Sequence, residues 1–398
     1  MAATVEHLRR ANRARVLEQL VYSGSMSRTV LGRRLELSSG GITNIVDDLV
    51  ADGLVVEEGT RATRGRPVTL LKPNADAALF IGAEVGERDV AVELFDLSMT
   101  LRESASRELR DGRSDPTLVG ALLRDAVDEI VARHPGRVSG IGLAVPGTVE
   151  TPGDGGDPIV YAPSLGWKPT PVSVLLDAEI PVFAENATSV TALAEQRLNR
   201  DDNRSHFTVA HLGRWVGLGA VMNGELVRGS NGMAGQWGHT TAEPTGPLCR
   251  CGSRGCLESL IGAEALLGQW HAAGGPDQTG SGWDRITALC EAARDGDPIA
   301  SGVVADALQR LGISLGNVIT LLNPERVFIS GWVGLRLMHY FGAELEAAVT
   351  SHAFGPSTKT LQIVPTSFGG DTTAVGAALI PLARFIEQIA AGPAKASS

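Results

Sequence analysis

The sequence predicts an α/β protein in two parts: a winged helix-turn-helix at the N-terminus and a larger two-lobed α/β body. Two patterns support this division. Three helical apolar periodicities and a hairpin fill the first 75 residues, and short strands then alternate with helices. Charge divides in the same place. Residues 1–75 carry 11 Lys and Arg against 8 Asp and Glu (net +3), and the remainder carries 24 against 37 (net −13). A mildly basic head on an acidic body indicates DNA contact at one end only.

Length and composition set the general class. The chain has 398 residues, of which 43% are hydrophobic, which is enough for two or three domains with real cores. We expect no apolar run of the roughly 20 residues needed to cross a bilayer, and the N-terminus lacks the apolar core of a secretory signal. We therefore expect a cytoplasmic protein with no membrane partner.

Three helices are expected in the head, over residues 5–22, 29–35 and 39–52, with Ser27 capping the second and a turn at residues 37–39. This order is that of a helix-turn-helix, in which the third helix reads the DNA. The first turn of that helix offers small polar groups that can reach bases or phosphates: Ser38, Ser39, Thr43 and Asn44. An ordinary three-helix bundle has the same periodicity and remains the alternative.

A hairpin is expected after these helices, with strands at residues 54–58 and 68–71 around a tip at 59–67. Such a wing distinguishes a winged helix from a bundle. The tip contains Arg61, Arg64, Gly65 and Arg66, followed by Pro67. Proline keeps this stretch extended, so that the arginines can enter a narrow A/T-rich minor groove. The alternative is a solvated charged loop.

The body begins near residue 76 and alternates strands with helices. We expect a first lobe over residues 76–195, to which a C-terminal helix at about 380–398 returns, and a second lobe with the oligomer interface over 196–379. A cleft should lie between them. The clearest expected elements are a helix over 115–133 and strands at 79–86, 90–95, 138–145, 182–184, 208–211, 219–223 and 327–330.

A metal site is the sharpest feature of the body. His239, Cys249, Cys251 and Cys256 follow the spacing His-x9-Cys-x-Cys-x4-Cys, and one imidazole with three thiolates completes a tetrahedral structural Zn²⁺ site. Glycines 252 and 255 allow the tight loop that this spacing needs. Buried free thiols are the alternative. Cys290 lies on an expected helix over 286–293 and is assigned to core packing.

From about residue 78 to 385 the chain resembles the ROK family (repressor, open reading frame, kinase), and the winged-helix head resembles the repressor branch of that family. The metal motif with Glu258 carries the resemblance most specifically. Further matches are residues 223–226 (Asn-Gly-Glu-Leu), 232–235 (Gly-Met-Ala-Gly), 238–239 (Gly-His) and 323–325 (Asn-Pro-Glu). The resemblance implies an actin-like ATPase fold, a sugar in the cleft, and a homodimer or homotetramer.

The residues that family kinases use for phosphoryl transfer are changed in three places. The first phosphate loop reads Glu84-Val-Gly-Glu-Arg88, which puts the Glu87 carboxylate where a phosphate must lie. The second reads Gly213-Arg-Trp-Val-Gly217, with Trp215 in place of a glycine. The family base, the Asp of Glu-Asn-Asp-Ala, is Ala187 here, which cannot accept a proton. We therefore expect neither kinase activity nor bound ATP.

Sugar binding is a separate question. The resemblance implies that Asn186, Gln236, His239 and Glu258 contact sugar hydroxyls, although a family Glu is Gln236 here, which adds a donor and removes a charge. His239 would then serve both the metal and the sugar. Alternatively these groups only brace the metal loop. Trp167 is expected either to stack on a pyranose face or to fill the core.

These observations predict a sugar-responsive transcriptional regulator, most simply a repressor. It would bind double-stranded operator DNA and carry a sugar or sugar phosphate in a catalytically inactive, kinase-like cleft. Two alternatives stay open: an active sugar kinase with an added DNA-binding head, and a DNA-binding regulator whose body takes no ligand. The sequence does not choose the effector, the operator or the sign of regulation.

Overall fold

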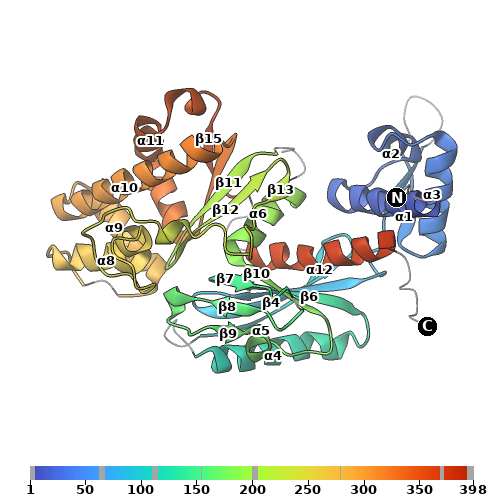
Figure 1. Cartoon of the computed structure of the whole chain (residues 1–398), viewed down its shortest axis with the longest axis horizontal. Coiled ribbons are helices and arrows are strands. Elements are labelled where there is room, and N and C mark those ends of the chain that lie inside the picture. The colour runs from blue at the N-terminus through green and yellow to red at the C-terminus, as the bar shows by residue number, and fades with distance from the viewer. Residues whose placement is uncertain are drawn as a thin grey trace.

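The computed structural model describes residues 5–61, 68–109, 115–153, 155–199, 205–277, 279–367 and 372–391. Figure 1 shows the head at one end of the molecule, beside the first lobe and the helix α12, with the second lobe on the other side. The division of the body predicted from the sequence remains a proposal. The boundary expected between residues 195 and 196 falls inside the helix α6 (Ala187–Leu198).

The head is a winged helix. Its elements are α1 (Val5–Ser23), α2 (Arg28–Arg34), α3 (Ser39–Ala51), β1 (Val55–Arg61) and β2 (Val68–Pro73). The expected helices and the expected strands are therefore confirmed to within a few residues. Serine side chains begin two helices: Ser27 accepts a hydrogen bond from the amide of Val30 at 3.3 Å, and Ser38 from that of Gly41 at 3.2 Å.

The hairpin excludes the three-helix bundle. β1 and β2 pair antiparallel, and Met26 adds an isolated bridge to Leu71 on the outer side of β2. Three segments thus form a small wing sheet beside α3. The tip lies outside the described residues, and with it lie Arg64, Gly65 and Arg66; for Arg61 only the strand backbone is described.

The first lobe is a five-stranded sheet in the order β10-β6-β3-β4-β5, in which β10, β6 and β3 are parallel. The helix α4 covers β4 and β5 on one face and α12 covers β3 and β6 on the other. The elements are β3 (Leu79–Val85), β4 (Asp89–Asp96), β5 (Leu101–Glu108), α4 (Pro116–Arg133), β6 (Val138–Val145), β7 (Thr148–Glu150), β8 (Ile159–Tyr161), η2 (Pro163–Leu165), β9 (Thr170–Pro171), α5 (Val172–Leu175) and β10 (Val182–Asn186).

The second lobe has a sheet in the order β13-β12-β11-β14-β15. Helix α6 packs on β12, and α11 packs on β14. The elements are β11 (Phe207–Leu212), β12 (Val216–Met222), β13 (Glu225–Leu226), η3 (Trp237–His239), α7 (Glu258–Ile261), α8 (Ala263–Ala272), α9 (Gly282–Arg294), α10 (Pro298–Leu322), β14 (Arg326–Ser330), α11 (Trp332–His352, kinked at Phe341), η4 (Gly355–Thr358) and β15 (Gln362–Pro365).

The helix α12 (Thr372–Ala391) lies directly on two glycines of the first-lobe sheet. A Cβ atom at Gly82 would stand 1.9 Å from the carbonyl oxygen of Ala374, and one at Gly142 would stand 1.9 Å from that of Ala377. Both distances are far inside van der Waals contact, so only glycine permits this approach of helix to sheet.

By length and composition alone, Thr373–Ala391 could cross a membrane, and this corrects the expectation that no such segment exists. Its apolar character has a second explanation in the fold. The helix packs against β3, β6, α6 and α1, and 44% of its most apolar stretch is buried inside the chain. Apolar side chains on this helix therefore serve the core.

One apolar cluster joins the head to the body. It contains the head core (Leu17, Leu31, Val46, Leu49, Leu71 and their neighbours) together with Phe80, Phe95, Ala194, Leu382 and Ile386 of the body. The head core is therefore continuous with that of the body, and α1 packs against α12.

We predict that Gly142→Ala lowers the free energy of unfolding by about 1–3 kcal/mol or more, because the added methyl forces α12 off the sheet. The control is Gly302→Ala on α10, where a Cβ meets nothing within 4 Å. That change should stabilise the helix by about 0.5–1 kcal/mol. Urea denaturation of both variants checks the prediction, and equal stability of the two would contradict the close packing of α12.

Candidate functional site

The exposed face of α3 carries the polar residues that the sequence predicted to read DNA. Ser38, Ser39, Thr43 and Asn44 are all exposed, while Ile42, Ile45, Val46 and Leu49 are buried on the opposite face. The hydroxyl of Thr43 donates to the carbonyl of Ser39 at 2.8 Å, and Ser38 is held as the helix cap. The side-chain amide of Asn44 has no protein partner within the part of the chain that the structure describes.

Ion pairs fix α3 against its neighbours. Arg9 and Arg13 of α1 pair with Asp48 and Asp52 on the side of α3 that faces α1. Arg28, at the start of α2, contacts Asp47 at 3.1 Å and Glu57 of the wing at 3.2 Å. Arg28 therefore connects the reading helix to the wing, and the pairs neutralise acidic groups that would otherwise repel phosphates.

Two basic residues next to this face were not singled out from the sequence. Arg33 and Arg34 end α2 and are exposed, with no ion-pair partner among the described residues. In a helix-turn-helix the helix before the reading helix crosses the DNA backbone, so these arginines belong to the same candidate interface. The sequence signal that could have identified them is their position at the end of the short helix that precedes the reading helix.

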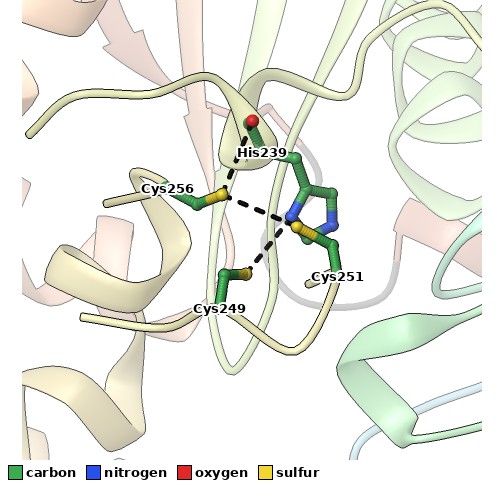
Figure 2. Close-up of side chains that lie close together, drawn as sticks. All are labelled: His239, Cys249, Cys251 and Cys256. Carbon is green, nitrogen blue, oxygen red and sulfur yellow. Dashed lines mark hydrogen bonds between the residues drawn. The ribbon is translucent and has the colours of Figure 1, made fainter. Parts of the chain in front are cut away.

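The four predicted metal ligands come together. Figure 2 shows the sulfur atoms of Cys249, Cys251 and Cys256 gathered around the imidazole of His239. The four ligand atoms all lie within 4.8 Å of one another. The Nδ1 atom of His239 is 3.7 Å from the Cys249 sulfur, and the sulfurs of Cys251 and Cys256 are 3.6 Å apart. A tetrahedral ion bound at about 2.0–2.3 Å holds its ligands about 3.5–3.8 Å apart, so the cluster fits a metal.

Local backbone geometry makes this cluster possible. The 3-10 turn η3 presents His239, and Thr241 pairs with Cys256, which brings the two halves of the motif side by side. Gly252 and Gly255 both have positive φ, at 94° and 64°, and a Cβ at Gly255 would stand 1.5 Å from the carbonyl oxygen of Glu243. The glycines inside the motif are thus required by the turn.

Thiol ionisation supports the same assignment. Burial first, and then the neighbouring thiols Cys251 and Cys249, together raise the pKa of Cys256 to about 12. Burial also raises the pKa of Cys249 above its usual value. Three thiolates this close together repel one another, and a divalent cation removes that repulsion and binds the ionised form. The residues present can therefore hold a metal ion.

Glu258 and Asn186, two of the implied sugar ligands, make hydrogen bonds to other groups of the protein. Glu258 accepts hydrogen bonds from the hydroxyl of Ser164 at 2.8 Å and from the amide of Val216 at 3.0 Å. Asn186 is the N-cap of α6: its oxygen accepts from two amides there, and its nitrogen donates to the carbonyl of Gly147 at 2.5 Å. The sequence did not indicate these structural roles.

The other implied sugar ligands are half-buried. Gln236 precedes η3, and its side chain has no hydrogen-bond partner among the residues described here; His239 belongs to the metal cluster. No side-chain hydrogen bond joins any two of the four implied residues within the described ranges. Trp167 is half-buried against the core of the first lobe, so it contributes to packing there.

A cleft of about 510 Å³ lies between the lobes, where the two altered phosphate loops face each other. Its lining includes Glu87, Arg214, Trp215 and Trp332, and none of the four implied sugar residues. Trp215 is buried and stacks on His211 at 5.6 Å, and burial lowers the pKa of His211 to about 4. The space at the second phosphate loop is thus filled by the indole ring of Trp215 and the neutral imidazole of His211.

The Glu87 carboxylate lies in this cleft, where the first lobe meets the second. It accepts one hydrogen bond from the amide of Arg214 at 2.6 Å and another from the indole Nε1 of Trp332 at 2.7 Å. Ala187, at the first turn of α6, is buried and offers no acidic group. The arrangement therefore provides a carboxylate where a phosphate would need donors, and no base at the place of the family aspartate.

A winged helix on a two-lobed, actin-like body with these altered loops defines a class of protein: a DNA-binding regulator built on a sugar-kinase fold. Comparison with known proteins then gives the family. The ROK family profile matches residues 80–384, and a MarR family profile matches residues 9–65 of the head. The chain belongs to the ROK family.

Two relatives whose names are those of repressors match most of the chain. The xylose repressor of Caldicellulosiruptor bescii is 27% identical over 336 residues, which is 81% of this chain and 83% of the relative. The N-acetylglucosamine repressor of Escherichia coli O157:H7 is 28% identical over 343 residues, 82% of each chain. These names agree with the expectation that the chain is a regulator and not an enzyme.

Solved structures agree on the fold. A ROK family transcriptional regulator, described as a homologue of the E. coli MLC protein, covers 97% of this chain and 100% of its own, at 26% identity and a TM-score of 0.77. A ROK glucokinase from Streptomyces griseus covers only 76% of this chain, with 99% of its own, at 22% identity and a TM-score of 0.62, and shows the shared fold of the body alone.

We predict that Cys251→Ser reduces the bound metal well below one ion per chain and lowers the melting temperature, because one of the thiolates is lost. Elemental analysis of the purified protein measures the metal. The matched control is Cys290→Ser, at a buried thiol on α9 outside the cluster. It should lower stability but leave the metal content unchanged. Equal metal content in Cys251→Ser and the unaltered chain would contradict the site.

Proposed function

We propose that the chain is a transcriptional regulator, most simply a repressor of carbohydrate genes, that binds operator DNA through α3 and the wing and responds to a sugar or sugar phosphate. It acts in the cytoplasm, where its operator is. The observation that carries this proposal is the combination of an exposed polar reading helix beside a wing with a body in which Glu87 and Ala187 replace the groups needed for phosphoryl transfer.

The head docks on DNA as other winged helices do. Ser39, Thr43 and Asn44 reach base edges in the major groove, and Arg33 and Arg34 contact the phosphates nearby. The wing arginines Arg61, Arg64 and Arg66, with Gly65 between them, enter the adjacent minor groove. Ser38 holds the start of α3 in place and presents its backbone to the DNA.

A homodimer, or a tetramer built from it, presents two heads to a two-fold operator with reading helices about 34 Å apart. Exposed apolar residues in the second lobe support such an interface. Leu321 at the end of α10 is 82% exposed and Phe354 after α11 is 61% exposed. A hydrogen bond of 3.0 Å from the amide of Phe354 to Thr320 holds these two segments together. Side chains of this kind, left in solvent, are typical of a self-association surface.

The metal is proposed to be a structural Zn²⁺ ion. Three thiolates and one imidazole in a closed tetrahedral arrangement are the ligands that zinc prefers, and no position is left open for water. When bound, the ion supplies cross-linking of the loop and no catalytic chemistry. His239, Cys249, Cys251 and Cys256 would hold it and keep the loop from residues 240 to 256 in one conformation.

The effector is proposed to bind where Asn186, Gln236, His239 and Glu258 approach the junction of the lobes. Contacts that cross the lobes there include the hydrogen bond from Ser164 to Glu258, one from Arg250 to the carbonyl of Ser164 at 2.8 Å, and the ion pair of Arg228 with Glu185 at 2.9 Å. A sugar hydroxyl can replace the Ser164 hydroxyl on Glu258 with a bond of the same kind. Such an exchange changes how the lobes are held, which gives the effector different affinities for two closures.

The helix α6 connects this region to the head. Its first turn is capped by Asn186, and near its other end Arg197 pairs with Glu18 of α1 at 2.8 Å and lies 5.1 Å above the ring of Tyr22. Ala194 belongs to the apolar cluster shared with the head. A rigid helix that touches the effector region at one end and α1 at the other can move the head when the lobes shift.

Two alternatives are testable beside this proposal. An active sugar kinase would release ADP from ATP with one member of a sugar panel, and Ala187 argues against it because no other carboxylate is provided at that place in the first turn of α6. A regulator with a ligand-free body would bind DNA equally with and without every sugar in the same panel.

We predict that Arg64→Ala with Arg66→Ala weakens binding to a DNA fragment from upstream of the coding sequence, because two groove contacts are lost. The slope of log affinity against log salt should fall by about 1–2, since each phosphate neutralised contributes about 0.9. The control is Arg294→Ala, an exposed arginine of the second lobe that pairs with Glu344. An unchanged salt slope in the double variant would remove the wing from the interface.

We predict that Arg197→Ala uncouples the effector from DNA binding. Affinity for DNA without sugar should stay within about threefold, whereas the change caused by sugar should fall toward none, because α6 loses its contact with Glu18 and Tyr22. Fluorescence anisotropy with D-xylose, N-acetylglucosamine, D-glucose and the 6-phosphates of the two hexoses measures both quantities.

Arg197→Lys keeps the charge and should keep most of the response, while Arg133→Ala, a surface arginine of α4, is the control. A full sugar response in Arg197→Ala would exclude this route. If no sugar alters the DNA affinity of the unaltered chain, the effector part of the proposed function is wrong.

A further inference from the structure

Glu87 connects the two lobes through a single carboxylate. It lies in the turn between β3 and β4 of the first lobe, whereas both of its hydrogen-bond donors belong to the second lobe. One oxygen accepts from the amide of Arg214 at 2.6 Å, and the other accepts from the indole of Trp332 at 2.7 Å. The donors are 127 and 245 residues away in sequence, so this contact exists only in the folded, closed arrangement.

The surroundings of the carboxylate are those of an anion site. One donor is a backbone amide in the turn between β11 and β12, and the other is on the first residue of α11, a helix of 21 residues whose N-terminus favours negative charge. Gly213 leaves the space: a Cβ there would lie 2.6 Å from the Glu87 oxygen. The second lobe therefore provides a cradle with directed donors, and the first lobe provides the anion that fills it.

Charge and burial show that the carboxylate needs these donors. Burial is the largest effect and raises the pKa of Glu87 above its usual value, whereas the donors on Arg214 and Trp332, together with the charges of Arg214 and Arg88, oppose that rise. His211, stacked on Trp215, faces the same cradle: its Nε2 atom is buried without a hydrogen-bond partner in the described chain, 3.0 Å from the Cβ position at Gly213. A carboxylate buried here without its donors would be costly, so its contacts hold the lobes together.

We propose that Glu87 is a built-in anionic ligand of the second lobe that keeps the two lobes closed, and that a small oxyanion, a carboxylate or inorganic phosphate, binds the same cradle once the Glu87 side chain is removed. In this arrangement the cleft needs no nucleotide for closure. The contact of Glu87 with the second lobe stays closed, and only the contact between Ser164 and Glu258 can change when an effector binds. The proposal concerns closure of the body and does not depend on DNA binding.

The test is chemical rescue of Glu87→Ala in the full-length chain. Its melting temperature should be about 4–10 °C below that of the unaltered protein, as expected when a buried, hydrogen-bonded charge is lost. Sodium formate, acetate or phosphate at tens of millimolar should restore a large part of the loss, whereas sodium chloride at matched ionic strength should not. The unaltered protein should show no anion-specific shift, because its cradle is already filled.

Two further variants keep the test decisive. Asp89→Ala removes an exposed carboxylate two residues after Glu87, at the first residue of β4, and should change neither the melting temperature nor the response to anions. If Glu87→Ala does not fold, Glu87→Gln replaces it, because Gln keeps the size of the side chain and one acceptor oxygen. Its melting temperature should lie below that of the unaltered chain. Trp332→Phe combined with Glu87→Ala should cost less than the sum of the two single changes.

Hydrogen exchange supplies a readout of closure itself. Loss of Glu87 should increase exchange in the β3–β4 turn and in the β11–β12 turn together, and added phosphate should reverse both, because one contact joins the two lobes. The proposal is overturned if Glu87→Ala melts like the unaltered chain, or if neither formate, acetate nor phosphate restores stability beyond chloride. Either result leaves the DNA-binding function as it stands.

Discussion

The close approach of α12 to the first-lobe sheet is the constraint on which the rest of the structure depends. Because Gly82 and Gly142 have no side chains, the backbone of α12 rests directly on β3 and β6. The same helix has a glycine of its own, Gly376, against the carbonyl of Val190 in α6. Thus α12 contacts α6, the first-lobe sheet and α1 of the head at the same time.

The body can be understood as a kinase fold whose own side chains have taken the places of ligands. Glu87 provides an anion to the second-lobe cradle, and Trp215 with His211 fills the loop around it. Near the metal loop, the hydroxyl of Ser164 donates to Glu258, which the family resemblance implies as a sugar ligand. In the proposed function, closure of the two lobes is the change that would reach the head.

The metal loop belongs to the same arrangement. His239 lies in the metal cluster, while Glu258 begins the helix directly after Cys256 and contacts both Ser164 and the amide of Val216. A metal ion that fixes this loop also fixes the position of Glu258. The loop therefore contributes to the junction of the lobes through the placement of one buried carboxylate.

The sequence by itself determined the local elements and the chemistry-bearing residues. Apolar periodicity and caps such as Ser27 place helices, glycines permit the turn of the metal loop, and the spacing from His239 to Cys256 predicts a metal site, because all of these depend on neighbours in sequence. Only the tertiary structure decided which distant groups meet. It brought the Glu87 carboxylate within hydrogen-bond distance of Arg214 and Trp332 and Glu258 within that of Ser164. It also packed the head core against α12. Such pairings depend on packing between elements far apart in the chain, and no local pattern records them.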